Sequence, residues 1–126
     1  DRLKLLALGN EDVPVGQYST EILTNMGLLE GLETDGKITY GSNVKEVTTQ
    51  VSEGAADAGI IYATDAFSAG LMVVEEAGKD LCKQVIYPAA VLKTAQNPDE
   101  AQAFLDYLQT DECMEVFHEV GFSRAP

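Results

Sequence analysis

Apolar residues are grouped along the chain in two ways, as short unbroken runs and as longer segments with three- and four-residue spacing. Short runs closed by glycine, asparagine or aspartate are typical of buried strands. The predicted strands are Leu3–Leu8, Lys37–Tyr40, Asp57–Tyr62, Leu71–Val74 and Gln84–Leu92. Pro88 lies inside the last of them and indicates an edge position or a bend, because proline cannot donate to a sheet ladder.

Helices are predicted between the strands and along the C-terminal tail. Apolar residues at helical spacing, with capping residues before them and glycine after them, set the bounds. Ser42 or Asn43 is a suitable N-cap for the second helix, and Thr64 or Asp65 for the third. The predicted helices run from about Gly16 to Gly27 or Gly31, from Val44 to Gly54, over Ala66–Ala69, from Asn97 to Leu108, and from Thr110 or Asp111 to Gly121.

The alternation of strands with helices predicts the α/β fold class, with a mostly parallel sheet flanked by helices in three layers. A length of 126 residues suits about one domain, and a hydrophobic share of 45% is typical of a globular chain. No apolar run approaches the roughly 18 residues that a membrane span needs. No signal peptide is visible, and because the first residue is Asp1 we expect the chain to begin inside a longer protein or after processing.

The net charge of −13 narrows the range of partners. Nucleic acids and anionic membrane surfaces attract clustered lysine and arginine, so an excess of 21 acids over 8 bases argues against both. A small anion is not excluded, because uncharged backbone N–H groups can bind one.

The sequence offers few groups for catalysis or metal binding. Cys82 and Cys113 form no CxxC pair and have no nearby histidine, which argues against zinc and favours two free thiols, although a disulfide stays open. His118 is the only histidine and is interpreted as a structural helix residue. There is no GxSxG, HExxH or P-loop motif, and no pair of acids is placed for general acid and base roles. We therefore expect a binding protein rather than an enzyme.

The most informative feature is a pair of helices that begin directly after a strand and a turn, near Val15 and at Val44. In an α/β sheet such helix starts lie outside the carboxyl ends of the strands, where ligands bind. Each offers unpaired N–H groups and the positive end of the helix dipole. Tyr62 ends a strand at the same edge and can donate its hydroxyl. These groups could bind a tetrahedral oxyanion, or they could be no more than caps, turns and a packed aromatic ring.

Four stretches of the chain resemble the molybdate-binding proteins. ALGNEDVPVGQYSTEIL is similar to their GNPxxVPAGxYAxExL, and GSNVKEVTTQVSEGAADAGIIYATDA to their ENVRxALxxVExGEADAGIVYxTDA. YPAAVLKTAQNPDEAQAFLDYL is similar to YPxAVLKxxKNPxAAxAFxDFL, and MEVFHEVGF to xxIFxxYGF. The stretches cover Ala7–Leu23, Gly41–Ala66, Tyr87–Leu108 and Met114–Phe122, in the family's order.

The resemblance implies a periplasmic or membrane-anchored extracellular protein that serves the permease of an ATP-binding-cassette importer. Members have the type II periplasmic-binding-protein fold, in which two α/β lobes joined by crossover strands enclose molybdate or tungstate without any other cofactor. By analogy, residues 1–83 are the second lobe, and residues 84–126 are a crossover strand and C-terminal helices that belong to the first lobe. The partners implied are the permease and either the missing N-terminal lobe or a second copy of the chain.

The resemblance also implies a ligand set made of neutral donors. The backbone N–H groups of Val15 and Val44 and the hydroxyl of Tyr62 match the second-lobe contacts of the family. Val15 replaces the family's usual alanine, a change that could tighten the pocket, and two first-lobe serines lie in motifs that this chain lacks. The residues expected to support the site are Pro14, Gly16, Asn43 and Asp65.

Two other functions remain open at this point. An effector-sensing domain of a transcriptional regulator could share this fold, and it would usually follow a DNA-binding segment. An anion-handling hydrolase would need a nucleophile or a metal cluster, and the sequence shows neither.

Overall fold

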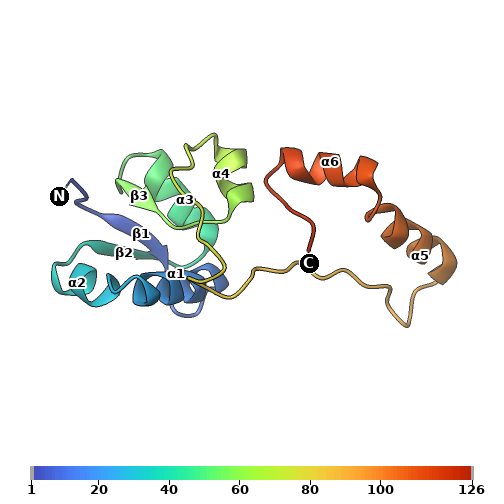
Figure 1. The fold of residues 1–126 in the computed structure, drawn as a ribbon, viewed down its shortest axis with the longest axis horizontal. Helices are drawn as coiled ribbons and strands as arrows, with labels where there is room; N and C mark the ends of the chain where they lie inside the picture. Colours follow the sequence, from blue (N-terminus) through green and yellow to red (C-terminus); the bar gives the residue numbers. More distant parts are fainter. Residues whose placement is uncertain (1, 126) are drawn as a thin grey trace. The chain divides into compact units, whose positions relative to one another are not determined.

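The chain folds into two compact units, Asp1–Gln84 (unit 1) and Val85–Pro126 (unit 2). The structure is a computed structural model that describes residues 2–125 (Figure 1). Within that range, no helix is both long enough and apolar enough to cross a membrane.

Unit 1 is built around a three-stranded parallel sheet with strand order β2-β1-β3. The central strand β1 (Leu6–Gly9) pairs with β2 (Ile38–Gly41) from Leu6 opposite Ile38 to Gly9 opposite Gly41. On its other side β1 pairs with the short strand β3 (Ala58–Gly59). Because all three strands run the same way, their carboxyl ends lie at one edge of the sheet.

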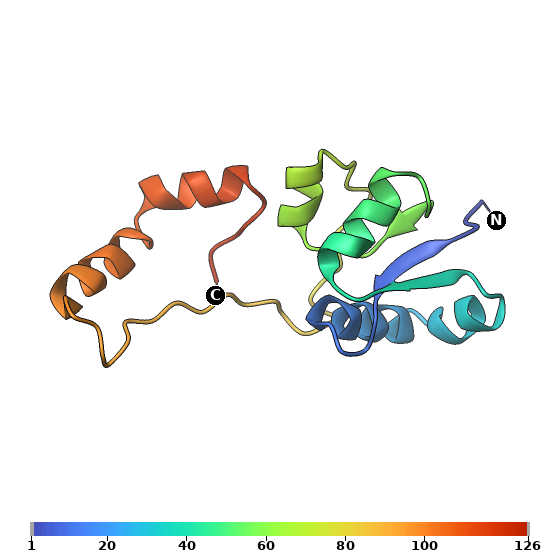
Figure 2. The same ribbon diagram turned by 180° about the vertical axis from the view of Figure 1, so that it is seen from behind.

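Four helices cover the two faces of this sheet, so unit 1 has the predicted three layers. The helices α1 (Pro14–Asn25) and α2 (Leu29–Thr34) lie on one face, and α3 (Val44–Ser52) and α4 (Ala63–Ala69) lie on the other (Figures 1 and 2). The α/β prediction is confirmed.

The two faces of β1 bury different side chains because successive residues of a strand point to opposite sides. Leu6 and Leu8 pack with Leu23 of α1, and partly buried residues of α2 join them. Ala7 packs on the opposite side with Val47 of α3. Burial of β1 on both faces explains why its sequence is an unbroken apolar run rather than an alternating one.

Unit 2 contains two helices, α5 (Pro98–Tyr107) and α6 (Asp111–Glu119), and no buried residue among positions 85–125. Thr110 caps α6 by accepting a hydrogen bond from the Cys113 N–H. The ring of Phe122 packs edge-on against Tyr87 and against Phe117, with ring centroids 5.3 Å and 5.7 Å apart. Local contacts of this kind hold the unit without a closed core.

Most of the predicted helices are confirmed, with small shifts at their ends. The first begins at Pro14 rather than near Gly16, since proline suits the first helical position. Gly27, with a φ of 69°, follows its end, whereas Gly31 lies inside α2, a helix that the sequence pattern did not predict. Thr64 and Asp65 are wrong as caps, because Tyr62 is the N-cap of α4 and no side chain caps that helix.

Two of the predicted strands are wrong, and the first and third are shorter than expected, the first covering Leu6–Gly9 instead of Leu3–Leu8. Leu71–Val74 and the predicted crossover strand Gln84–Leu92 are both irregular in structure. An apolar β-branched run becomes a strand only where a neighbouring strand accepts its hydrogen bonds, and neither segment has one among residues 2–125. Met72 and Val74 are accordingly about 85% exposed. The third strand covers Ala58–Gly59 instead of Asp57–Tyr62.

The carboxylate of Asp57, the residue before β3, is hydrogen-bonded to the backbone just before β1. Its Oδ2 accepts hydrogen bonds from the N–H groups of Leu5 and Lys4, at 2.9 Å and 2.7 Å. These bonds favour the ionised form and lower the pKa of Asp57 below its ordinary value. The carboxylate therefore stabilises the fold at pH values above the ordinary pKa, and this contribution is lost as the pH falls through the lowered pKa.

We predict that Asp57→Asn lowers the thermal unfolding midpoint at neutral pH, because the amide oxygen is a weaker acceptor than the carboxylate. The difference between variant and wild type should shrink as the pH falls below the pKa of Asp57, and circular dichroism melts across this range would measure it. Glu53→Gln is a matched control at an exposed acid. If Asp57→Asn lowered the unfolding midpoint by the same amount at neutral and at strongly acidic pH, the ionised carboxylate of Asp57 would not be the source of the lost stability.

Candidate functional site

Three helix starts lie at the carboxyl edge of the sheet. β1 leads into α1, β2 into α3 and β3 into α4, each through a short connection. Gly9 and Gly41 end their strands opposite one another, and the N–H of Asn10 donates to the Gly41 carbonyl at 2.9 Å. The structure thus places Val15, Val44 and Tyr62 in the first turn or at the N-cap of three helices on one edge of unit 1.

The start of α1 leaves one backbone donor unused. Pro14 has no N–H, and the N–H of Gly16 donates to the Val13 carbonyl at 2.9 Å. The N-cap Val13 supplies no side-chain acceptor. Within residues 2–125, the N–H of Val15 has no acceptor. Since an unpaired N–H at a helix start attracts an anion, the local sequence singles out Val15 as a donor.

The side chain of Val15 points into the protein interior and is only 2% exposed. It packs so close to β1 that a Cβ atom added at Gly9 would lie 2.8 Å from its Cγ1. A Cβ added at Gly16 would overlap the Asn10 carbonyl oxygen. Both glycines are therefore required for the helix start to approach the strand end, and valine in place of alanine fills core space at this edge.

The start of α3 is closed by a reciprocal cap that still leaves donors unused. Asn43 Oδ1 accepts from the Glu46 N–H at 2.8 Å, which confirms Asn43 as the N-cap. The Glu46 carboxylate in turn accepts from the N–H and the hydroxyl of Ser42, at 2.6 Å and 2.8 Å. The hydrogen bonds from Ser42 lower the pKa of Glu46. In the described part of the chain, the N–H groups of Val44 and Lys45 have no acceptor.

Tyr62 stands at the N-cap of α4, directly after the short connection from β3. Its ring meets Tyr18 of α1 edge-on, with centroids 6.5 Å apart and planes at 73°. This contact places the Tyr62 ring beside α1, the helix whose first turn contains Val15. Asp65 lies in the first turn of α4, where partial burial raises the pKa of its carboxyl group. Its expected support of the site therefore does not come from capping.

The candidate donors at this edge are uncharged backbone N–H groups and a tyrosine hydroxyl, and Lys45 is among them only through its backbone N–H. No group of three or more histidine, cysteine, aspartate or glutamate side chains within residues 2–125 could hold a metal ion. Cys82 and Cys113 are free, and His118 is exposed with Nδ1 2.9 Å from the Phe122 carbonyl oxygen. The arrangement suits reversible binding of an anion by neutral groups.

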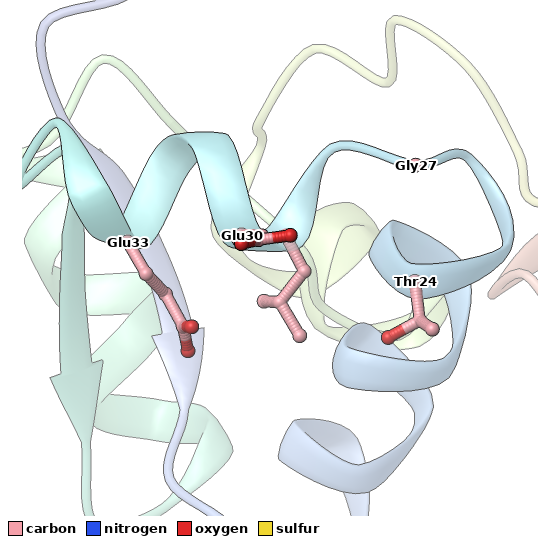
Figure 3. A pocket seen from close by; sticks show the side chains of 5 residues that line it. Thr24, Gly27, Glu30 and Glu33 are labelled. Atoms are coloured by element: carbon pink, nitrogen blue, oxygen red, sulfur yellow. The ribbon is translucent and has the colours of Figure 1, made fainter.

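A separate hollow of about 240 Å³ lies between the end of α1 and α2. Thr24, Gly27 and Leu29 line it together with Glu30 and Glu33 (Figure 3). Two carboxylates would repel an oxyanion, and this hollow is at the opposite end of α1 from Val15. It is therefore not a second candidate for the same ligand.

Sequence patterns alone did not single out three contributors to this edge. Glu46 occupies the third helical position, where a glutamate often closes a cap, and this position could have indicated its role. Tyr18 lies one turn after Val15, but its contact with Tyr62 joins residues 44 positions apart. Gly9 looked like a strand terminator, and only the packed structure shows that it admits Val15.

Comparison with known proteins places this chain among bacterial solute-binding proteins. An ABC transporter substrate-binding lipoprotein of Bacillus subtilis, YvgL, is 40% identical over 120 residues, which are 94% of this chain and 45% of that protein. The molybdate-binding protein ModA of Haemophilus influenzae is 34% identical over 112 residues, 88% of this chain and 43% of that protein. The chain thus spans about half the length of the curated relatives it matches.

Solved structures show the same half-length match. A structure titled as the substrate-binding domain of a molybdenum ABC transporter from Clostridium difficile superposes with a TM-score of 0.88 at 33% identity. The match covers all of this chain and 55% of the chain in that structure. The periplasmic molybdate-binding protein of Azotobacter vinelandii gives 0.78 at 19% identity, over all of this chain and 56% of its own, and supports the fold alone. The Bacillus and Clostridium names are provisional assignments.

The sequence profile described as "Bacterial extracellular solute-binding protein" matches residues 1–123. Proteins of this kind bind a solute for an ABC transporter and are not enzymes. With the match covering nearly every residue, the chain belongs to the bacterial extracellular solute-binding proteins.

Proposed function

We propose that this chain is the C-terminal half of the solute-binding component of an ABC importer for molybdate or tungstate. The oxyanion accepts hydrogen bonds from the backbone N–H groups of Val15 and Val44 and from the hydroxyl of Tyr62. The names of the Haemophilus relative and of the Clostridium structure support the choice of ligand. No other cofactor takes part.

The observation that carries the proposal is that the N–H of Val15 at the start of α1 and the N–H of Val44 at the start of α3 have no acceptor among residues 2–125. Each belongs to a helix whose dipole places partial positive charge at that end. The strand register brings both helix starts to one edge of the sheet, and the Tyr18 contact brings Tyr62 toward α1. Pro14, Gly16 and Asn43 support the site by fixing these helix starts.

Neutral donors suit a doubly negative ion on an acidic protein. A lysine or arginine would add affinity for every anion, whereas N–H and hydroxyl groups at fixed positions favour anions of matching size. Molybdate and tungstate differ from sulfate mainly in size, so spacing of donors can separate them.

The proposed partners follow from this role. The binding protein works outside the cytoplasmic membrane, in the periplasm or anchored at the cell surface, and delivers its ligand to the membrane permease. The other half of the ligand's coordination comes from an N-terminal lobe or from a second copy of the chain. The family match lends no support to the alternative of a regulator's sensing domain.

We predict that this chain alone binds molybdate at least ~100-fold more weakly than a two-lobe relative. Each missing hydrogen bond to a charged ligand costs roughly 1.5–3 kcal/mol, and about two first-lobe bonds are absent. Isothermal titration with molybdate, tungstate, sulfate and phosphate would measure this, with the Haemophilus protein as the control. Submicromolar affinity of the isolated chain would contradict a half-site.

We predict that Val44→Pro weakens binding by about 10-fold or more, because it removes one N–H donor while α3 remains folded. Proline is favoured at the first helical position, and the extended backbone of Asn43 (φ −160°, ψ 166°) is compatible with a following proline. Val44→Ala is the matched control because it keeps the N–H. The shift of the Val15 amide resonance on titration would report affinity, and equal affinities for the two variants would exclude the Val44 donor.

Unit 2 exposes apolar side chains that a solute-binding protein would cover. The large ones are Val85, Ile86, Tyr87, Leu92, Phe104, Tyr107 and Val116. Because apolar exposure of this kind favours association, we predict that the chain either docks this unit on unit 1 or pairs with another copy.

Light scattering and hydrogen exchange would test this expectation, with Phe104→Glu and Val116→Glu as variants that weaken docking or pairing. Phe67→Glu in unit 1 is a control at a similarly exposed residue. A strictly monomeric wild type with a fully exchanging unit 2 would contradict the prediction.

A further inference from the structure

Tyr18 and Tyr62 form the aromatic contact between α1 and the start of α4. Their ring centroids are 6.5 Å apart and their planes meet at 73°, an edge-to-face arrangement that aromatic pairs favour. Both rings are partly buried. The contact joins α1, whose first turn contains Val15, to the residue proposed to donate a hydroxyl.

The contacts that the Tyr62 ring makes with neighbouring side chains, Tyr18 among them, restrain its direction. Its backbone is extended (φ −74°, ψ 150°) and lies at a helix start that no side chain caps. The hydroxyl is at the far end of the ring, so a change of side-chain rotamer moves the donor by several ångströms. Affinity for an anion then depends on how much of the time the ring points to the site.

Tyr18 is well placed to provide that restraint because its own helix is firmly held. Gly9 and Gly16 allow α1 to pack directly against the end of β1. Ser19, next to Tyr18, is fully buried and donates its hydroxyl to the Val15 carbonyl at 2.6 Å. The backbone of Tyr18 is therefore fixed relative to the Val15 N–H, and its ring contacts that of Tyr62.

We propose that Tyr18 is a positioning residue of the oxyanion site. Its ring keeps the Tyr62 hydroxyl directed to the same ligand position as the Val15 N–H. The proposal rests on the proposed function and adds a residue to it. The ring of Tyr18 provides the contact, and its own hydroxyl is not required. We therefore expect phenylalanine at position 18 to preserve the affinity for molybdate, and leucine to reduce it.

The test is a double-mutant cycle on the full 126-residue chain with sodium molybdate as the ligand. Tyr18→Leu should lower the affinity about two- to tenfold, the range expected for one aromatic pair. Tyr18→Phe should bind like the wild type. In a Tyr62→Phe background, Tyr18→Leu should have no further effect, because the donor that it positions is gone.

Two readouts separate positioning from loss of fold. Amide shifts of Val15 and Val44 give the affinity. Near-ultraviolet circular dichroism without ligand reports the tyrosine rings, since the chain has five tyrosines and no tryptophan. Tyr18→Leu should change this spectrum more than Tyr107→Leu, the control in unit 2.

Three results would overturn the assignment of Tyr18. Tyr18→Leu could bind as tightly as the wild type, Tyr18→Phe could lose as much affinity as leucine, or Tyr18→Leu could lose the same factor with and without the Tyr62 hydroxyl. A wild-type chain whose Val15 and Val44 amides do not respond to molybdate would instead overturn the proposed function, and the role of Tyr18 with it.

Discussion

The close approach of α1 to the end of β1 is the constraint on which the rest of unit 1 depends. A Cβ at Gly16 would overlap the Asn10 carbonyl, and a Cβ at Gly9 would crowd Val15. With both positions free of side chains, Val15 enters the core and its N–H is held at the sheet edge. The same packing holds the backbone of Tyr18, whose ring contacts that of Tyr62. In our proposal, this close approach of helix and strand therefore positions two of the three donors.

The proposed site would allow a chain with a net charge of −13 to bind an anion without a basic side chain. The donors are backbone N–H groups at helix starts, where the peptide dipoles already point the right way. The two nearby acids, Glu46 and Asp65, would not repel a bound anion equally. The Glu46 carboxylate accepts hydrogen bonds from the N–H and the hydroxyl of Ser42 before α3, and these bonds stabilise its negative charge. The Asp65 carboxylate has no such hydrogen-bond partner among residues 2–125. Burial raises the pKa of Asp65, which reduces the negative charge it carries as the pH falls.

Sequence reasoning predicted the layers, the starts of α3, α5 and α6, and Asn43 as a cap, because these depend on local patterns and residue chemistry. It failed where structure depends on distant partners. Gln84–Leu92 has the composition of a strand but no strand beside it, and α2 was missed because Gly27 and Gly31 looked like terminators. The Tyr18–Tyr62 contact crosses from α1 to α4 and has no local signal. The roles of Val15, Val44 and Tyr62 in binding remain predictions.

The most direct measurement is a crystal structure of the chain soaked in molybdate, with the metal located by molybdenum anomalous scattering. The account predicts one peak at the carboxyl edge of the sheet, with oxyanion oxygens within about 3 Å of the Val15 and Val44 nitrogens and of the Tyr62 hydroxyl. A peak elsewhere, or one whose oxygens contact none of these three groups, would contradict it.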